Sequence, residues 1–338
     1  MKRPDPARAR ILRDARSKAA VLEILDPDAP EEADECQTFS PLGASVGRWS
    51  LYAGGTRRGL DLSVPLAEGT GPGRFPLPLV GKERRLFALR LRDQVYFLAE
   101  RRLPMAGGFN VRDLGGLVGA DNRRVIWGSI LRADDLQALT PDDQAYLAGL
   151  PLRTVLDFRL EQEAARFPDR LPPTVRRRLS RPILAGARNA GAASFSEEEA
   201  DAFMTDIYRY LALAEKPLAV YRELFHLLQW EEDAQPLLFH CSAGKDRTGF
   251  AAALVLLSLG VPQETVLRDY LASRLCLTGK YPSSAGIFSV REIYLRTALE
   301  EIVRVHGSLG GYLENVLAVD QERMRRLYLE RMPQAWKK

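Results

Sequence analysis

The sequence predicts an α/β protein with a small all-β region ahead of it. Residues 37–102 consist of short apolar or alternating runs, such as RLFALRL and QVYFLAERRL, separated by Gly- and Pro-rich turns. This texture is typical of short antiparallel strands. From residue 103 onward, strand-like runs alternate with helical periodicities, which indicates an α/β domain. We therefore expect a sandwich-like β domain over 37–102 and an α/β domain over 103–338.

Residues 1–36 are predicted to be a lead-in made of two blocks. The first block is basic and compatible with a helix, whereas the second, EILDPDAPEEADE, is acidic and interrupted by proline. Such a composition favours a linker or a partly disordered segment. Nothing in residues 37–102 resembles a chemical site, so we expect a packing or partner-binding role for that domain.

The α/β region can be divided into elements by pattern. RVIWGSILRA and LRTVLDFR are predicted strands, and TPDDQAYLAGL between them is a helix with Thr140 as its N-cap and Pro141 in the first turn. Residues 196–228 carry helical periodicity with a break near Lys216 and Pro217. PLLFH is then a short buried strand, and TGFAAALVLLSLG is a buried helix that ends at Gly260.

The rest of the chain, beyond Gly260, is predicted to be helical apart from one segment. Residues 275–289 are irregular, and we expect them to form a mobile cover.

Composition and charge narrow the class of protein. The chain is 46% hydrophobic and 27% charged with a net charge of +4, which suits anionic substrates but is no signature of nucleic-acid binding. Cys36, Cys241 and Cys276 show no paired spacing, so we expect no disulfide framework and a reducing compartment. No secretory pattern and no apolar run long enough for a membrane span is found. These observations predict a cytoplasmic protein.

The stretch HCSAGKDRTG, residues 240–249, carries the chemistry. A strand, a loop and a helix N-terminus follow one another there, and this order creates an anion-binding cradle of backbone N–H groups. Next to Lys245 and Arg247, the pKa of the Cys241 thiol is expected to fall from about 8.5 to roughly 3.5–7.5. Arg247 has the planar fork that holds two phosphate oxygens. Gly244 and Gly249 let the backbone curl around the ligand.

Three other interpretations of this loop were weighed. An inert buried cysteine beside a capped helix would favour fewer charges on the loop. A sulfurtransferase or an arsenate reductase also places a cysteine on an anion-binding loop, but neither chemistry calls for the full H-C-x5-R-T arrangement together with the motifs upstream of it. A phosphate-recognition module of weak or no activity, with the β domain as the binder, remains an alternative.

HCSAGKDRTG resembles the phosphate-binding loop of cysteine-dependent protein tyrosine phosphatases. The Lys245–Asp246 pair is similar to an atypical bacterial branch, the protein tyrosine/serine phosphatases. Further motifs resemble that family in the same order: NVRDLGG, WGSILRADDL, LDFRLEQE, MTDIYR and VHGSLGGYL. The resemblance covers about residues 103–332 and implies a central, mostly parallel sheet flanked by helices.

The resemblance also implies roles for individual residues. Cys241 attacks phosphorus and forms a phosphocysteine, and Thr248 stabilises the thiolate when it leaves. His240 orients the loop, while Arg112, Asp113 and Arg132 pack around it, either as structural salt bridges or as substrate-binding residues. No metal and no cofactor is expected. Phosphate is held by the loop residues Ser242, Ala243, Gly244, Lys245, Asp246, Arg247 and Thr248.

The general acid is harder to place. Relatives tend to carry it on a segment that here reads RLSRPILAGARNAG, which contains no carboxylate. Asp246 is the favoured candidate. Asp157 is a second one, for which an ion pair with Arg159 is an equal alternative, and Asp206 is a third. The second cation of the cradle, Lys245, suits phosphorylated proteins or phospholipid headgroups, so phosphotyrosine, phosphoserine/threonine and phosphoinositides are all expected substrate classes.

Overall fold

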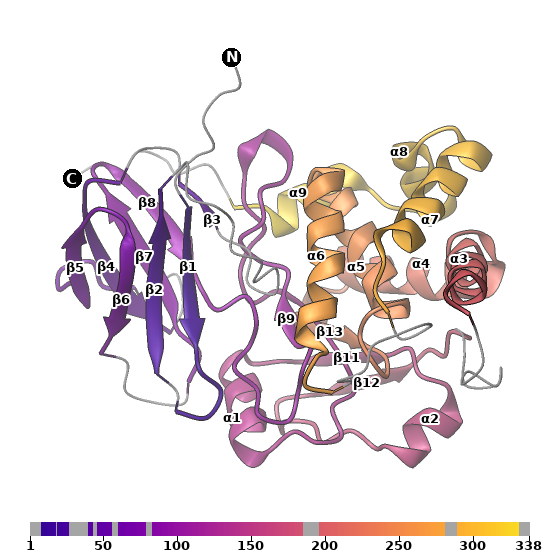
Figure 1. Cartoon of the computed structure of the whole chain (residues 1–338), viewed down its shortest axis with the longest axis horizontal. Coiled ribbons are helices and arrows are strands. Elements are labelled where there is room, and N and C mark those ends of the chain that lie inside the picture. The colour runs from indigo at the N-terminus through magenta and orange to yellow at the C-terminus, as the bar shows by residue number, and fades with distance from the viewer. Residues whose placement is uncertain are drawn as a thin grey trace.

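The structure is a computed structural model that describes residues 8–17, 19–26, 40–42, 46–55, 60–78, 83–184, 196–280 and 289–330. Figure 1 shows two parts side by side, a body of strands β1–β8 and a larger body in which helices surround a second set of strands. We call residues 8–98, which contain β1–β8, the β-module.

The β-module is an antiparallel sandwich, as predicted. One sheet has the order β3-β1-β2-β6 and the other β5-β4-β7-β8. Alternate side chains such as Ile11, Leu22, Trp49 and Leu89 form a shared core between the sheets. The strands are β1 (Arg8–Arg13), β2 (Ala20–Leu25), β3 (Ser40–Pro41), β4 (Arg48–Gly54), β5 (Ala67–Thr70), β6 (Gly73–Leu77), β7 (Leu86–Leu91) and β8 (Gln94–Leu98).

The prediction for the start of the lead-in was wrong. Residues of the predicted lead-in, from its helix-compatible block into the start of its acidic block, form β1 and β2, which pair with each other in antiparallel register. Ile11 and Leu22 are buried in the sandwich core, and Arg10 pairs with Glu23 directly across the two strands. Burial and cross-strand pairing outweigh the weak helical preference of the segment. Residues 27–39, which include Cys36 and most of the acidic block, lie outside the described residues.

The sheet of the larger body is mostly parallel, as predicted. Its order is β12-β11-β13-β10-β9, and only β9 runs antiparallel to its neighbour. The register places His240 at the end of the central strand, between Ala133 and Asp157. The strands are β9 (Arg112–Asp113), β10 (Ile130–Ala133), β11 (Thr154–Asp157), β12 (Arg177–Ser180) and β13 (Leu237–His240).

Successive residues of these strands enter two separate cores. Leu237 and Phe239 pack with the larger set of helices, whereas Leu238 packs with α1 on the opposite face, because side chains alternate along a strand. The helices are α1 (Pro141–Gly149), α2 (Glu161–Arg166), α3 (Glu197–Leu213), α4 (Glu215–Trp230), α5 (Arg247–Ser258), α6 (Gln263–Cys276), α7 (Glu292–His306), α8 (Leu309–Gly311) and α9 (Gln321–Tyr328).

Several local predictions can be compared with this arrangement. Thr140 caps α1 through the backbone N–H of Asp143, as predicted. The break between the two helices of residues 196–228 falls at Ala214, slightly before the predicted position. Helix α6 extends through Cys276 into the segment expected to be irregular, and residues 281–288 of that segment are outside the described part of the chain.

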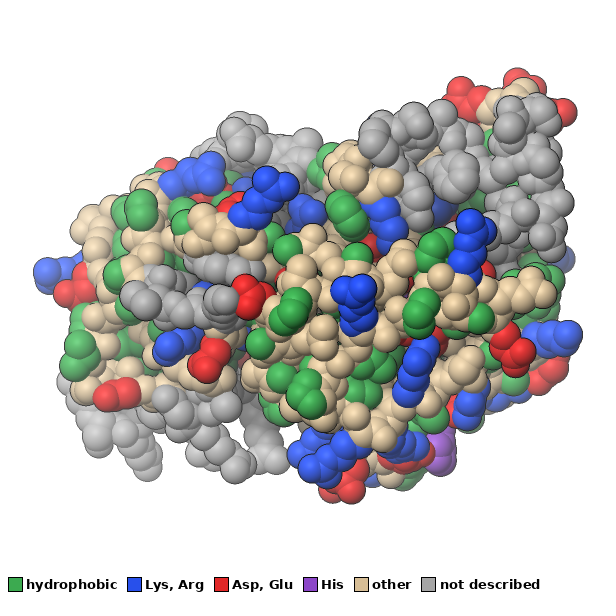
Figure 2. Space-filling model, turned by 90° about the horizontal axis from the view of Figure 1, so that it is seen from below, with side chains coloured by type: hydrophobic (Ala, Val, Ile, Leu, Met, Phe, Trp, Pro, Cys, Tyr) green, Lys and Arg blue, Asp and Glu red, His purple; other side chains and the backbone are tan. Residues whose placement is uncertain are grey.

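The described residues include no helix long and apolar enough to cross a membrane. On the face shown in Figure 2, Lys and Arg side chains lie in separate groups, several of them next to acidic side chains.

Candidate active site

The loop between β13 and α5 is held from its outer side. Its backbone carbonyls are turned away from Cys241 and accept hydrogen bonds from neighbouring segments. The donors are the Asp135 N–H and Lys280 Nζ for Ser242 (3.3 and 3.2 Å), Asn110 Nδ2 for Ala243 and Gly244 (3.0 and 3.1 Å), and Arg132 Nη2 for Gly244 (2.7 Å).

With the carbonyls anchored outside, the Gly244 N–H turns inward and donates to Cys241 Sγ at 3.3 Å. Gly244 has φ +67°, and a Cβ there would lie 2.4 Å from the carbonyl oxygen of Ala133. Only glycine fits this position, because the left-handed conformation and the approach of the β10 backbone both exclude a side chain. The loop therefore has the curled form expected of an anion cradle.

Cys241 lies at the base of the loop and is almost completely buried. Thr248 is also buried, and its hydroxyl has no hydrogen-bond partner among the described residues. A buried hydroxyl without a partner is costly, so it remains available to a group that enters or forms in the site. Its place in the first turn of α5, behind the cysteine, suits the predicted role toward the thiolate.

Arg247 is held by the carboxylate of Glu163. This residue stands in the motif LDFRLEQE, but the sequence analysis assigned it no role. Glu163, on α2, accepts from Arg247 Nη1 at 2.8 Å and from Nη2 at 3.2 Å. It also accepts from the Ser242 hydroxyl at 2.7 Å. Burial raises the pKa of Glu163, but the hydrogen bond and charge of Arg247 outweigh it and lower the pKa to about 2. Glu163 is thus ionised and fixes the guanidinium plane.

Asp246 precedes Arg247 and has two close neighbours. The Tyr208 hydroxyl, on α3, donates to Asp246 Oδ1 at 3.0 Å. Lys245 Nζ lies 3.2 Å from Asp246 Oδ2 and donates to the Ser289 carbonyl at 3.1 Å. Burial and the charge of Asp246 raise the pKa of Tyr208 well above its usual value, so the phenol remains a donor. The Asp246 side chain is 20% exposed, which leaves it accessible to a bound substrate.

Asp157, the other catalytic candidate, is engaged elsewhere. Its two oxygens accept from Nε and Nη2 of Arg159 at 2.9 and 2.8 Å, and the side chain is 1% exposed. A carboxylate saturated by a guanidinium in the interior is a poor proton donor. The ion pair is the alternative that the geometry favours. The third candidate, Asp206, is exposed and pairs with Arg209.

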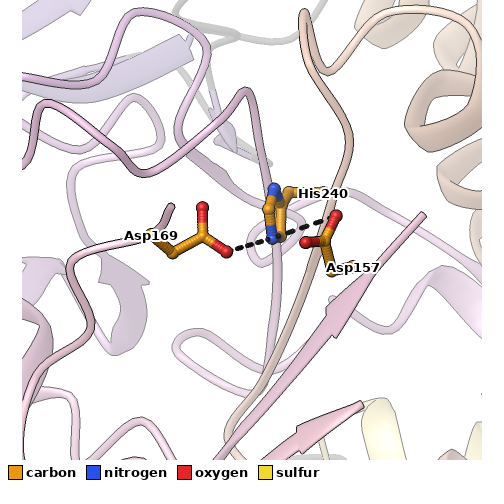
Figure 3. Close-up of side chains that lie close together, drawn as sticks. All are labelled: Asp157, Asp169 and His240. Atoms are coloured by element: carbon orange, nitrogen blue, oxygen red, sulfur yellow. Dashed lines mark ion pairs between the residues drawn. The ribbon is translucent and has the colours of Figure 1, made fainter. Parts of the chain in front are cut away.

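His240 lies between Asp157 and Asp169, as Figure 3 shows. Its Nε2 is 3.4 Å from Asp169 Oδ2 and 3.7 Å from Asp157 Oδ1, while its Nδ1 is 3.3 Å from the Cys241 carbonyl. The two carboxylates and the imidazole have the spacing of metal ligands, but Arg159 donates to both carboxylates. Because the guanidinium of Arg159 already pairs with both carboxylates, the cluster is an ion-pair network that orients His240.

The supporting residues Arg112 and Arg132 are buried next to α6. Both donate to Asp269 of α6, and Arg132 also reaches Gly244. Burial, then the neighbouring charge of Arg112, lower the pKa of Arg132 to about 10. Asp113, the second residue of β9, was expected to pack around the loop, but in its described hydrogen bonds it accepts from Arg84 and from the Gly128 N–H instead.

Residues 103–330 match the model of the tyrosine phosphatase family. The chain belongs to the tyrosine phosphatase family. It is 34% identical over 243 residues to a Cupriavidus necator protein that is named as a tyrosine-protein phosphatase, covering 65% of this chain and 85% of that one. It is 28% identical over 269 residues to the triple specificity protein phosphatase PtpB of Mycobacterium tuberculosis, covering 64% of this chain and 94% of that one.

A comparison with solved structures gives a weaker likeness. The crystal structure of P. aeruginosa TpbA in complex with phosphotyrosine is 20% identical, covers 61% of this chain and 88% of its own, and has a TM-score of 0.25. The family match confirms the predicted phosphatase core and makes this chain a protein tyrosine phosphatase. The sulfurtransferase and arsenate reductase alternatives are thereby set aside.

Four of the residues that surround the loop and that the sequence analysis did not single out are Glu163, Tyr208, Asn110 and Asp269. Glu163 and Tyr208 stand inside quoted motifs, LDFRLEQE and MTDIYR, and Asn110 opens another, NVRDLGG. A polar residue in a motif without an assigned role was the signal that could have identified them. Asp269 stands in no quoted motif and carried no such signal.

Proposed function

We propose that this phosphatase hydrolyses phosphomonoesters through a phosphocysteine intermediate on Cys241, without a metal ion. The observation that supports this most directly is the inward Gly244 N–H, which donates to Cys241 Sγ at 3.3 Å. An N–H group at that distance stabilises a thiolate, and the N-terminus of α5 adds its positive dipole end. A thiolate is the nucleophilic form of cysteine.

In the first step, Sγ of Cys241 attacks phosphorus and the bond from phosphorus to the ester oxygen breaks. The electron pair of that bond goes to the oxygen, which takes a proton from the carboxylic acid of Asp246. Arg247, oriented by Glu163, and the loop N–H groups stabilise the three equatorial oxygens. Asp246 is assigned as the acid because it is part of the loop and accessible, whereas Asp157 is enclosed by Arg159.

In the second step, water attacks the phosphocysteine and the bond between sulfur and phosphorus breaks. The electron pair returns to Sγ as a thiolate, which the buried Thr248 hydroxyl stabilises. Asp246, now a carboxylate, takes a proton from the water. Inorganic phosphate leaves, and the loop regains its starting state with Asp246 protonated.

The substrate class follows from the charges of the loop and from one relative. Lys245 adds a second cation next to Arg247, and its ammonium is held at the loop by Asp246 and Ser289. The relative PtpB is named for triple specificity. We infer that phosphotyrosine and phosphoserine/threonine of proteins are substrates, and that phosphoinositide headgroups are a further class. The cysteine pattern supports a cytoplasmic location.

The proposed mechanism is tested by phosphate release from p-nitrophenyl phosphate between pH 4.5 and 8, with EDTA present. We expect wild-type activity to survive EDTA and Cys241→Ser to lose roughly three or more orders of magnitude in kcat. Mass spectrometry of a quenched reaction should show one phosphate on Cys241. A Cys241→Ser variant of undiminished activity would contradict the mechanism. A folded wild type without activity would instead favour the phosphate-recognition alternative.

A further inference from the structure

One arginine from outside the family-matched region reaches the interior of the phosphatase core. Arg101 lies just after β8 and before residue 103, where the family match begins. It is 3% exposed. Its Nη1 donates to the Gly115 carbonyl at 3.0 Å and its Nη2 donates to Asp269 Oδ1 at 2.8 Å. A connection between two parts of the chain thus contributes a buried charge to the catalytic domain.

Asp269 links this arginine to the phosphate-binding loop. Its carboxylate also accepts from Arg132 Nη1 at 2.6 Å and from Arg112 Nη1 at 3.1 Å. The other nitrogen of the Arg132 fork, Nη2, donates to the Gly244 carbonyl at 2.7 Å. A continuous series of buried hydrogen bonds therefore runs from Arg101 through Asp269 and Arg132 to the residue whose N–H faces Cys241.

The cluster is rich in positive charge. Three guanidiniums, those of Arg101, Arg112 and Arg132, share the single carboxylate of Asp269. All four side chains are buried, so their charges are weakly screened by solvent. The excess of guanidinium charge behind the loop attracts a thiolate and a phosphate dianion on its other side. Removing one arginine weakens this positive field and leaves the Asp269 carboxylate with two guanidinium partners instead of three.

The position of Arg101 is fixed by the core, where its carbonyl accepts from the Asp113 N–H of β9 at 2.8 Å, and by contacts of neighbouring residues with the β-module. Glu100, the preceding residue, is fully buried and contacts both Arg13 of β1 (3.5 Å) and the Tyr146 hydroxyl of α1 (3.3 Å). Nearby, the Trp127 indole donates to the Phe97 carbonyl of β8 at 3.0 Å. Buried charge pairs are costly to break, so the β-module and the core form a fixed contact at this point.

We propose that Arg101 is a positioning residue of the phosphatase: held in place by the core and the β-module, it sets the phosphate-binding loop through Asp269 and Arg132. This inference rests on the proposed role of Cys241 and assigns the β-module a part in catalysis. The connection that follows the module supplies a residue that the family-matched region does not contain. Arg101 touches no substrate, so its effect must be transmitted to the reactivity of Cys241 and the affinity for phosphate.

The test compares Arg101→Met with Arg10→Met in the full chain. Arg10 forms a buried pair with Glu23 inside the β-module, and neither of these residues contacts the Asp269 cluster in a described interaction. The rate of alkylation of Cys241 by iodoacetamide is followed against pH, and protection by inorganic phosphate gives a dissociation constant. For Arg101→Met we expect the alkylation pKa to rise by about half a unit or more and phosphate affinity to fall roughly fivefold or more. Arg10→Met should match wild type in both.

A second variant keeps the proposal testable if Arg101→Met fails to fold. Arg101→Lys retains the charge but loses the fork that joins Gly115 to Asp269, so we expect a near-normal alkylation pKa and weakened phosphate protection. Wild-type values for a folded Arg101→Met, or wild-type phosphate protection in Arg101→Lys, would overturn the proposal. Failure of the proposed function is a different result, because wild-type Cys241 would then react only as an ordinary thiol with a pKa of about 8.5, or not at all, and phosphate would not protect it.

Discussion

The Tyr208 hydroxyl donates a 3.0 Å hydrogen bond to Oδ1 of Asp246, from a helix that lies outside the phosphate-binding loop. The same hydroxyl is 2.8 Å from that of Tyr270. A phenol has one proton, so when it goes to Asp246 the Tyr270 hydroxyl supplies the second bond. Oδ1 is thereby fixed as an acceptor, which leaves Oδ2, 3.2 Å from Lys245 Nζ, as the oxygen that carries the proton in the proposed mechanism. The motif MTDIYR acquires a role through this contact.

We expect Tyr208→Phe to impair protonation of the leaving group. Its kcat should fall about 10-fold for phenyl phosphate, whose leaving group needs a proton, and much less for p-nitrophenyl phosphate. Asp246→Asn should show the same selectivity with a loss of about 100-fold, and the double variant should lose no more than Asp246→Asn alone. Initial rates on both esters provide the measurement.

Tyr312→Phe is the matched control for Tyr208→Phe. Its buried hydroxyl donates to the Ala212 carbonyl at 2.7 Å, so it removes a similar hydrogen bond without touching the loop. Equal losses on both esters in Tyr208→Phe would assign the tyrosine to folding alone.

Glu163→Gln should weaken the orientation of Arg247. The amide keeps the size of the side chain but loses the charge that pairs with both guanidinium nitrogens. We expect kcat/KM to fall about 10-fold, mainly through kcat, because the arginine is then less well placed for the transition state. Steady-state kinetics with p-nitrophenyl phosphate give kcat and KM separately for wild type and Glu163→Gln. An increase in kcat/KM would mean instead that Glu163 competes with phosphate for Arg247.

The same carboxylate predicts a pH dependence of stability. The pKa of Glu163 is lowered from 4.5 to about 2 in the folded chain. A lowered carboxyl pKa stabilises the fold above pH 4.5, and this stabilisation is lost as the pH falls toward 2. The difference in melting temperature between wild type and Glu163→Gln should thus be constant above about pH 5 and shrink below it. The exposed Glu161→Gln, on the same helix, is the control, and a difference independent of pH would contradict the assignment.

Gly244→Ala should disrupt the cradle. The added Cβ would meet the Ala133 carbonyl and would require a positive φ, at a cost of about 1–3 kcal/mol for the backbone strain alone. We expect phosphate protection of Cys241 to be lost and the free energy of unfolding to fall. Gly149→Ala is a suitable comparison, because a Cβ there meets nothing within 4 Å. Phosphate protection in Gly244→Ala equal to that of wild type would show that the loop can adapt.

Local sequence was sufficient for the loop and for most of the second domain. The strand ending at His240, the polar loop and the helix from Arg247 are contiguous, so their pattern of apolar and polar residues could be read directly. The local sequence was insufficient to predict strands β1 and β2. RARILR and AVLEIL become strands because they pair with each other and bury Ile11 and Leu22 against the other sheet of the β-module, β5-β4-β7-β8. The residues of one strand alone do not reveal which other strand will pair with it.

The sequence by itself singled out Cys241 as the proposed nucleophile, Arg247 as the proposed phosphate ligand and the glycine that shapes the loop, since these residues lie within one short segment. Only the tertiary structure decided what holds them. Glu163 is 84 residues from Arg247, Tyr208 is 38 from Asp246, and Arg101 is 168 from Asp269. Partners so distant in the chain meet only after the sheet and its helices have assembled. The physical reason is that a charge or hydroxyl finds its partner by burial in a common core, which periodicity along the chain cannot express.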